Sequence, residues 1–140
     1  MAGEQEQVEN SEDRVPAVLV VEGEIMIRLA VADGLRRRGY RVLGSSSGED
    51  AQKIMNTRGN IALVFADINL GAGMNGLELA RWIKITHPRT RIVFASGRYN
   101  SSAIDDLADA PLLEKPYSYD TAAAVVAQML GSKLESDLEH

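Results

Sequence analysis

An apolar run without a single polar residue, Ile61-Ala62-Leu63-Val64-Phe65-Ala66, lies near the middle of the chain and is followed directly by Asp67. A run this short and this apolar is typical of a β-strand that is buried on both faces. Such strands occur in parallel sheets that carry helices on both sides. The run therefore predicts an α/β fold, with Asp67 at the carboxyl end of an inner strand.

Short apolar runs alternate with helical patterns along most of the chain. Ile27, Val31 and Leu35 recur at helical spacing in one such pattern, and Gly39 follows as a helix stop. The predicted strands are residues 17–21, 40–43, 61–66, 91–95 and 112–113, and the predicted helices are residues 24–38, 47–57, 76–86, 101–108 and 118–130. Right-handed crossovers then give a doubly wound (βα)5 sheet with the flavodoxin-like strand order 2-1-3-4-5.

The length of 140 residues predicts one folded domain, which we place at residues 16–131. Residues 1–15 are polar and acidic, so we expect a disordered leader. Residues 132–140 are expected to form a disordered tail, and the final Leu138-Glu139-His140 is typical of an expression-tag remnant.

Composition excludes several classes of function. No apolar run is long enough to span a membrane, and the acidic start is unlike a signal peptide. The chain has no cysteine, which fits a reducing, cytoplasmic setting. A formal net charge of -5 argues against binding nucleic acid through a broad basic surface.

Polar residues that can do chemistry follow four of the predicted strands. Glu22 follows the first strand, Asp67 the third, Ser96 the fourth, and Lys115-Pro116 the fifth. Ligands of open α/β sheets bind beyond the carboxyl ends of the strands, where the strand order reverses. Glu22 and Asp67 should therefore meet across the crevice between the first and third strands.

These four residues together suit phosphoryl transfer to a carboxylate. Clustered acids repel one another unless a cation lies among them, and Mg2+ favours carboxylate ligands. Lys115 would favour the ionised form of Asp67 and hold an anionic group, while the Ser96 hydroxyl could donate to the same anion. Asp67 can then attack as the nucleophile while the cations neutralise the transferring phosphoryl group.

With these residues the chain resembles the receiver domain of two-component response regulators, over roughly residues 18–130. The resemblance implies that Asp67 is the phosphoacceptor, Lys115 the catalytic lysine and Ser96 the switch hydroxyl. It also implies that Glu22, Asp67 and the backbone carbonyl of Asn69 bind Mg2+. Such a domain catalyses only its own phosphotransfer and dephosphorylation, and its donor is a histidine kinase or a phosphotransfer protein.

A narrower resemblance involves the run Phe94-Ala95-Ser96-Gly97-Arg98-Tyr99. It is similar to the Phe-Ala-Thr-Gly-x-Tyr signature of the alphaproteobacterial "FAT GUY" single-domain regulators, with serine in place of threonine. That resemblance implies a histidine kinase of the HWE/HisKA2 type, a role in stress signalling, and output through a downstream protein partner, because no effector domain follows residue 130.

The chain departs from the family pattern at two positions. Gly23 stands where the family has a second acid that binds the metal, which implies a weaker Mg2+ site that Glu22 or Glu24 would partly restore. Leu112 stands where many receivers have a rotating aromatic residue, so Tyr99 is the candidate mobile aromatic.

Two other interpretations stay open. In the first, the chain is a pseudo-receiver, a binding module phosphorylated poorly or not at all because Gly23 removes a metal ligand. In the second, less favoured one, it is an enzyme or flavin carrier on the same fold. The acidic Glu22-Gly23-Glu24 argues against a flavin phosphate site, and no Gly-Lys-Ser/Thr follows the glycines after Asp67, which excludes a P-loop.

Overall fold

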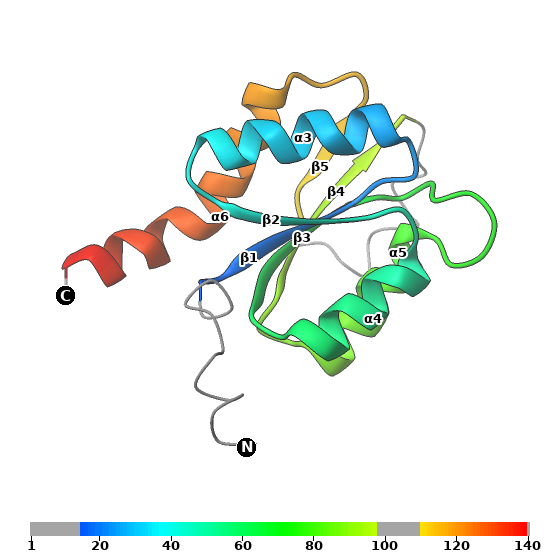
Figure 1. Cartoon of the computed structure of the whole chain (residues 1–140), viewed down its shortest axis with the longest axis horizontal. Coiled ribbons are helices and arrows are strands. Elements are labelled where there is room, and N and C mark those ends of the chain that lie inside the picture. Colours follow the sequence, from blue (N-terminus) through cyan, green and yellow to red (C-terminus); the bar gives the residue numbers. More distant parts are fainter. Residues whose placement is uncertain (1–14, 98–109, 140) are drawn as a thin grey trace, which may run out of the picture.

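The computed structural model describes residues 15–97 and 110–139, with side chains described up to Gly131 (Figure 1). The elements are β1 (Ala17–Val21), α3 (Ile25–Arg37), β2 (Arg41–Ser45), α4 (Gly48–Arg58), β3 (Ile61–Asp67), α5 (Gly76–Thr86), β4 (Arg91–Ser96), β5 (Leu112–Glu114) and α6 (Tyr119–Glu139). The five strands are parallel, in the order β2-β1-β3-β4-β5. The predicted flavodoxin-like sheet is therefore confirmed.

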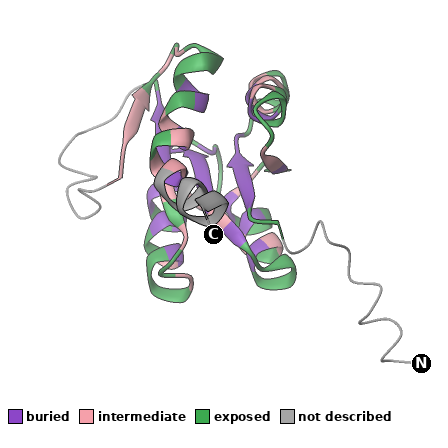
Figure 2. Cartoon of the chain, turned by 90° about the vertical axis from the view of Figure 1, so that its left-hand side faces the viewer, coloured by how far each residue is buried: buried purple, intermediate pink, exposed green. Residues whose placement is uncertain are grey.

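Helices cover both faces of the sheet, and the buried strands lie between them (Figure 2). On one face, Val18 and Val20 pack in one apolar cluster with residues of α3 and α6. On the other face, Leu19 and Val21 pack with residues of α4 and α5. Successive side chains of a strand point to opposite faces, so an unbroken apolar strand can supply both clusters.

Four strands extend further than their apolar residues predicted. β2 continues to Ser45, β3 to Asp67, β4 to Ser96 and β5 to Glu114. The reason is pairing with the neighbouring strands: Ser45 lies opposite Val21, and Asp67 lies opposite Ala95. Backbone hydrogen bonding does not stop where hydropathy changes, so the polar residues are held in the sheet itself.

The end of the last helix differs from the prediction, and two other predicted regions are not described. The last helix was expected to end at Leu130, but α6 continues as helix to Glu139 through the segment expected to be a disordered tail. That segment contains no proline, and it has two leucines, two glutamates and one lysine, which favour helix. The leader before Val15 and the predicted helix at residues 101–108 lie outside the described residues.

Local capping fixes the helices that border the carboxyl ends of the strands. The Ser47 side chain accepts a hydrogen bond from the Asp50 N–H at 3.1 Å at the start of α4. A reciprocal capping box occurs only at the start of α5 among these two helices, between Asn75 and Glu78. An aspartate is one methylene shorter than the glutamate or glutamine that a capping box uses.

Candidate functional site

The carboxyl ends of the strands bring together three of the residues predicted to act. The Nζ atom of Lys115 lies 2.8 Å from Oε1 of Glu22 and 2.8 Å from Oδ2 of Asp67. Lys115 follows the edge strand β5, which is two strands away from β3 in the sheet. The peptide bond between Lys115 and Pro116 is cis. One ammonium group therefore bridges the two carboxylates.

The remaining carboxylate oxygens are held by the backbone. The Glu24 N–H donates to Oε2 of Glu22 at 3.1 Å, and the Asn69 N–H donates to Oδ1 of Asp67 at 3.0 Å. Both carboxylates thus have a partner on each oxygen, which fixes their orientation. The Asp67 side chain is only 6% exposed and that of Lys115 is 22% exposed. Asp67 is therefore nearly enclosed, and Lys115 is the more accessible member of the pair.

The charges of the site change the pKa of its neighbours. Burial alone would lower the pKa of Lys115, but the hydrogen bonds and charges of Asp67 and Glu22 outweigh burial and raise it above its ordinary value. The lysine therefore stays protonated throughout the physiological range. Burial, followed by the charge of Glu22, raises the pKa of Tyr117 to about 12, so this phenol stays neutral.

Ser96 lies at the end of the neighbouring strand and is fully buried. Its backbone carbonyl accepts a hydrogen bond from the Lys115 N–H at 2.9 Å. The end of β4 is therefore tied to the lysine that bridges the two acids. This connection places Ser96 at the same edge of the sheet as Asp67, as its position after the fourth apolar run predicted.

The other predicted residues are less closely involved. Asn69 is exposed and contributes its N–H to Asp67. Glu24 is also exposed. It contacts Glu22 through its backbone N–H. Tyr99 lies outside the described residues, so its role as a mobile aromatic stays a prediction.

Gly76 allows α5 to begin directly against the acceptor strand. A Cβ atom built on this glycine would overlap the carbonyl oxygen of Asp67 and lie 2.8 Å from Cα of Ile68. The Gly76 N–H donates to the Ile68 carbonyl at 2.8 Å, so the close approach is part of the backbone hydrogen bonding. Any side chain at position 76 would push β3 and α5 apart.

We expect Gly76→Ala to lower the free energy of unfolding by about 1–3 kcal/mol, because the added methyl group overpacks a rigid backbone contact. Urea denaturation measures the loss. Gly131→Ala is the matched control, since its added Cβ would have no heavy atom within 4 Å. The control should change stability by no more than about 1 kcal/mol. Equal losses in the two variants would show that the contact with Asp67 carries no cost.

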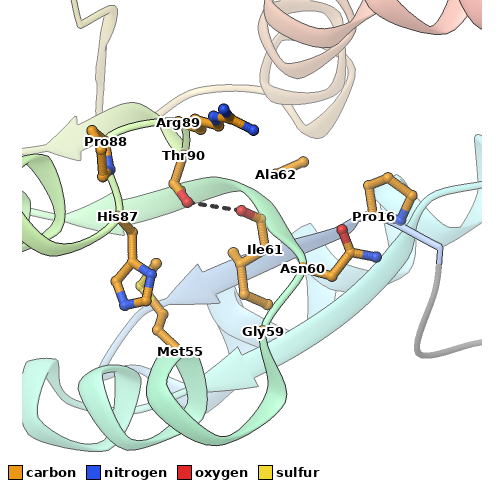
Figure 3. A pocket seen from close by; sticks show the side chains of 10 residues that line it. All are labelled: Pro16, Met55, Gly59, Asn60, Ile61, Ala62, His87, Pro88, Arg89 and Thr90. Carbon is orange, nitrogen blue, oxygen red and sulfur yellow. Dashed lines mark hydrogen bonds between the residues drawn. The ribbon is translucent and has the colours of Figure 1, made fainter. Parts of the chain in front are cut away.

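A hollow lies at the opposite end of the sheet, around the start of β3 (Figure 3). The Thr90 hydroxyl donates to the Ile61 carbonyl there at 2.8 Å, and the His87 ring packs against Trp82 with ring centroids 5.3 Å apart. Ile61 begins the strand that Asp67 ends. This hollow, including His87, is therefore separate from the pair of acids at Glu22 and Asp67.

Comparisons with known proteins identify the family to which this fold belongs. The model of a family described as "Response regulator receiver domain" matches residues 18–125. The chain belongs to this family. Among curated proteins, the receiver is similar to Sensor kinase CckA of Brucella abortus (strain 2308), with 33% identity over 136 residues. The match covers 93% of this chain and 14% of that protein.

Solved structures give the same result. The receiver domain of NtrX from Brucella abortus is 31% identical, with a TM-score of 0.74 over 81% of this chain and 98% of that chain. A response regulator receiver protein from Sinorhizobium medicae WSM419 is 26% identical, with a TM-score of 0.76 over 84% and 95% of the two chains. Receiver domains interact with sensor histidine kinases, and this chain spans only a small part of the curated sensor kinase that it matches.

Receiver domains generally bind Mg2+ at the phosphorylation site, and the oxygens of this receiver fit that ion in type. Glu22 and Asp67 have carboxylates, and the backbone carbonyl of Asn69, two residues after Asp67, is a further oxygen that could bind the ion. Within residues 15–97 and 110–131, no three acidic or histidine side chains gather into a group that could hold a metal. Glu24 therefore does not join Glu22 and Asp67 as a third acidic ligand. Lys115 lies between these two acids.

Two neighbours of the site were not predicted from the sequence. The guanidinium of Arg28 donates to the backbone carbonyl of Glu22 at 2.6 Å. The ring of Tyr117 packs edge-on against Phe65, two residues before Asp67, with centroids 5.8 Å apart. The position of Tyr117 two residues after Lys115 could have indicated it, whereas Arg28 looks like any exposed helical arginine. Among the described helices, none is long and apolar enough to cross a membrane.

Proposed function

We propose that this receiver accepts a phosphoryl group on Asp67 from a phosphorylated histidine of a kinase or phosphotransfer protein. The observation that supports this most directly is the bridge from Lys115 to both Asp67 and Glu22 at 2.8 Å. It joins a nucleophilic carboxylate, a second acid and a permanent positive charge at one edge of the sheet.

In the proposed reaction, a carboxylate oxygen of Asp67 attacks phosphorus while the bond between phosphorus and the donor imidazole nitrogen breaks. The electron pair of that bond stays on the imidazole, and the product is an acyl phosphate. Lys115 leaves the Asp67 oxygen and follows the negative charge onto the phosphoryl oxygens. Mg2+, when bound by Glu22 and Asp67, would neutralise charge on the same oxygens.

The same lysine can transmit the change. The backbone N–H of Lys115 donates to the Ser96 carbonyl, so movement of Lys115 acts on the end of β4. We propose that the altered ends of β4 and β5 change the affinity of the receiver for a downstream protein. This proposal includes signalling as a stand-alone, single-domain protein. The chain spans 14% of the length of CckA.

An apolar patch beside the crevice supports a protein as the phosphodonor. Ile25, Met26 and Leu29 on the first turns of α3 are 57%, 76% and 54% exposed. α3 starts three residues after Glu22, and Figure 1 shows its start at the same end of the sheet as the loop after β3. Clustered exposed apolar residues are typical of docking surfaces. We propose that this patch contacts the helices that carry the donor histidine.

We expect Met26→Glu to slow phosphotransfer from a phosphorylated histidine kinase roughly ten-fold, because a charge replaces a central apolar contact. Labelling by the small donor acetyl phosphate should not change. Ile85→Glu is the matched control, since Ile85 is 80% exposed on α5, near the other end of the sheet. If both variants slow transfer equally, or if Met26→Glu also slows acetyl phosphate, the patch is not the docking surface.

One observation favours a second function. Gly23 leaves two acids where a third would strengthen metal binding, and this supports the alternative of a pseudo-receiver that binds partners without efficient phosphorylation. Intact mass after incubation with acetyl phosphate and Mg2+, and then with a phosphorylated kinase of the HWE/HisKA2 type, separates the two functions. A gain of one phosphoryl group supports the phosphoacceptor, and no gain from either donor supports the binding module.

The subgroup is also a proposal. Phe94, Ala95, Ser96 and Gly97 are described and end the strand beside the site, while Arg98 and Tyr99 are not described. We propose from this partial signature that the receiver acts in stress signalling with a kinase of the HWE/HisKA2 type. Faster transfer from such a kinase than from an unrelated phosphorylated histidine kinase would support the assignment.

A further inference from the structure

We propose that Arg28 is a positioning residue for the acidic pair: its guanidinium fixes the backbone of Glu22 and, through it, the orientation of the Glu22 carboxylate. The guanidinium donates to the Glu22 carbonyl at 2.6 Å. Arg28 lies near the start of α3, and Glu22 is the first residue after β1. The inference rests on the proposed phosphoryl acceptance by Asp67, because Glu22 is the second acid of that site.

The edge strand β2 leaves room for the Arg28 side chain at Gly44. A Cβ atom built on Gly44 would lie 3.4 Å from Cδ and 3.6 Å from Cγ of Arg28. Gly44 is opposite Val20 of β1, which belongs to the apolar cluster on the α3 side of the sheet. The aliphatic part of Arg28 therefore lies over β2 at a position without a side chain, and the guanidinium reaches the end of β1.

Each polar group of Glu22 has a partner. Its N–H donates to the Ser45 carbonyl at 2.9 Å. Its carboxylate accepts from the Lys115 ammonium group and from the Glu24 N–H, and its carbonyl accepts from Arg28. Glu22 is only 4% exposed, and the backbone polar groups of buried residues need such partners.

The bond from Arg28 matters because a glycine follows. The Glu22 carbonyl belongs to the peptide unit that joins Glu22 to Gly23, and glycine allows backbone angles that other residues rarely adopt. Rotation of this peptide unit would move the Glu24 N–H, which holds Oε2 of Glu22 at 3.1 Å. The carboxylate would then lose the backbone contact that orients it. Arg28 therefore opposes a rotation that Gly23 permits.

Arg36 makes the same kind of bond away from the site. Its guanidinium donates to the Val42 carbonyl at 2.9 Å. Arg36 lies in the last turn of α3 and Val42 near the start of β2, at the opposite end of the sheet from Glu22. If these bonds only attached α3 to the sheet, the two arginines would be equivalent with respect to the site. Arg36 is therefore the matched control for Arg28.

Nuclear magnetic resonance of the full chain tests the proposal without metal or phosphate. In Arg28→Gln we expect the amide signals of Gly23 and Glu24 to shift. The ammonium protons of Lys115 should exchange faster with water, because an acid that accepts from them is less well oriented. Arg36→Gln should leave all these signals unchanged. Urea denaturation establishes that both variants are folded.

A Mg2+ titration separates the position of the acid from the charge of the arginine. Glu22 is one of the acids that would bind the ion, so loss of its orientation should weaken binding roughly ten-fold, the scale for a lost supporting residue. Loss of the positive charge alone would act in the opposite direction, because a nearby cation repels Mg2+. Weaker binding by Arg28→Gln supports the proposal, and tighter binding overturns it.

Variants of Gly44 provide an independent test. Gly44→Val places a branched side chain where the stem of Arg28 lies, so it should reproduce the changes at Gly23 and Lys115. Adding Gly44→Val to Arg28→Gln should bring no further change, because both act through the same bond. Gly44→Ala is the control, since its Cβ would be in ordinary contact with Arg28 at 3.4 Å and should leave the signals unchanged.

Two further results would overturn the proposal. The first is a set of unchanged Gly23, Glu24 and Lys115 signals in Arg28→Gln, and the second is an equal change of these signals in Arg36→Gln. A wild-type chain that neither binds Mg2+ nor takes a phosphoryl group would instead overturn the proposed phosphoacceptor. The signals of Gly23 and Lys115 would still decide the role of Arg28 in that case.

Discussion

The Asp67→Asn variant should incorporate no phosphoryl group from acetyl phosphate, whereas the wild-type chain gains one. An amide has no anionic oxygen to attack phosphorus, so the nucleophile is lost while size and shape are kept. The amide oxygen can still accept from Lys115, and Glu22 keeps its own contact with the lysine at 2.8 Å. The fold should therefore survive, and loss of labelling would report chemistry and not unfolding.

Intact mass spectrometry measures this loss directly, and peptide mapping locates the label. Asp33→Asn is the control, because Asp33 is an exposed acid on α3 whose partner is Arg37. The control should be labelled like the wild type. A label that persists in Asp67→Asn, or one that maps to another carboxylate, would remove Asp67 as the phosphoacceptor. An unlabelled wild type would instead favour the pseudo-receiver.

The Gly23→Asp variant should bind Mg2+ roughly ten- to hundred-fold more tightly than the wild type. This is the range by which metal affinity changes when a residue that supports a metal site is mutated. The structure has space for the side chain: a Cβ on this exposed glycine would meet only the Ser46 carbonyl oxygen, at 3.8 Å. The new carboxylate would join Glu22 and Asp67 and make a third acidic ligand available. Phosphorylation by acetyl phosphate should accelerate in parallel.

Amide chemical shifts of residues 22–24 and 67–69 measure the affinity during a Mg2+ titration. Trp82 fluorescence is a poorer probe, since Trp82 packs against His87 near the other end of the sheet. Gly23→Asn is the control, because it adds almost the same volume without charge and should leave the affinity nearly unchanged. Equal affinities of the aspartate variant and the wild type would show that Gly23 does not limit metal binding.

Lys115 connects the two predictions. Its ammonium lies between the two acids that would share a metal ion, so bound Mg2+ and bridging Lys115 compete for the same oxygens. A third carboxylate at position 23 adds repulsion that one lysine cannot neutralise. We therefore expect Gly23→Asp to be less stable than the wild type without Mg2+ and to regain stability when the ion is added.

Much of this site followed from the sequence because of one property of parallel sheets. Their strands all end at the same edge, so the polar residues that follow the apolar runs must come close together. Glu22, Asp67 and Lys115 could be grouped on that ground, although Lys115 is 93 residues away from Glu22 along the chain. The strand order followed in the same way from the alternation of strands and helices.

Other properties depend on distances that no local pattern contains. Hydropathy predicted that the third strand would end at Ala66, but pairing with β4 extends it to Asp67, and this aspartate is buried. The sequence also gave no reason to expect that α5 approaches the Asp67 carbonyl so closely that only glycine fits at position 76. Both features arise from the packing of complete elements against one another.

The amino-acid sequence alone thus determined the kind of sheet and which side chains share its carboxyl edge, since hydrophobic periodicity and connection rules are local and act over short stretches of chain. The tertiary structure decided how Lys115 divides its hydrogen bonds between Asp67 and Glu22, and how deeply Asp67 is buried. These outcomes depend on the relative placement of elements that are distant in sequence, and only the packed core fixes that placement.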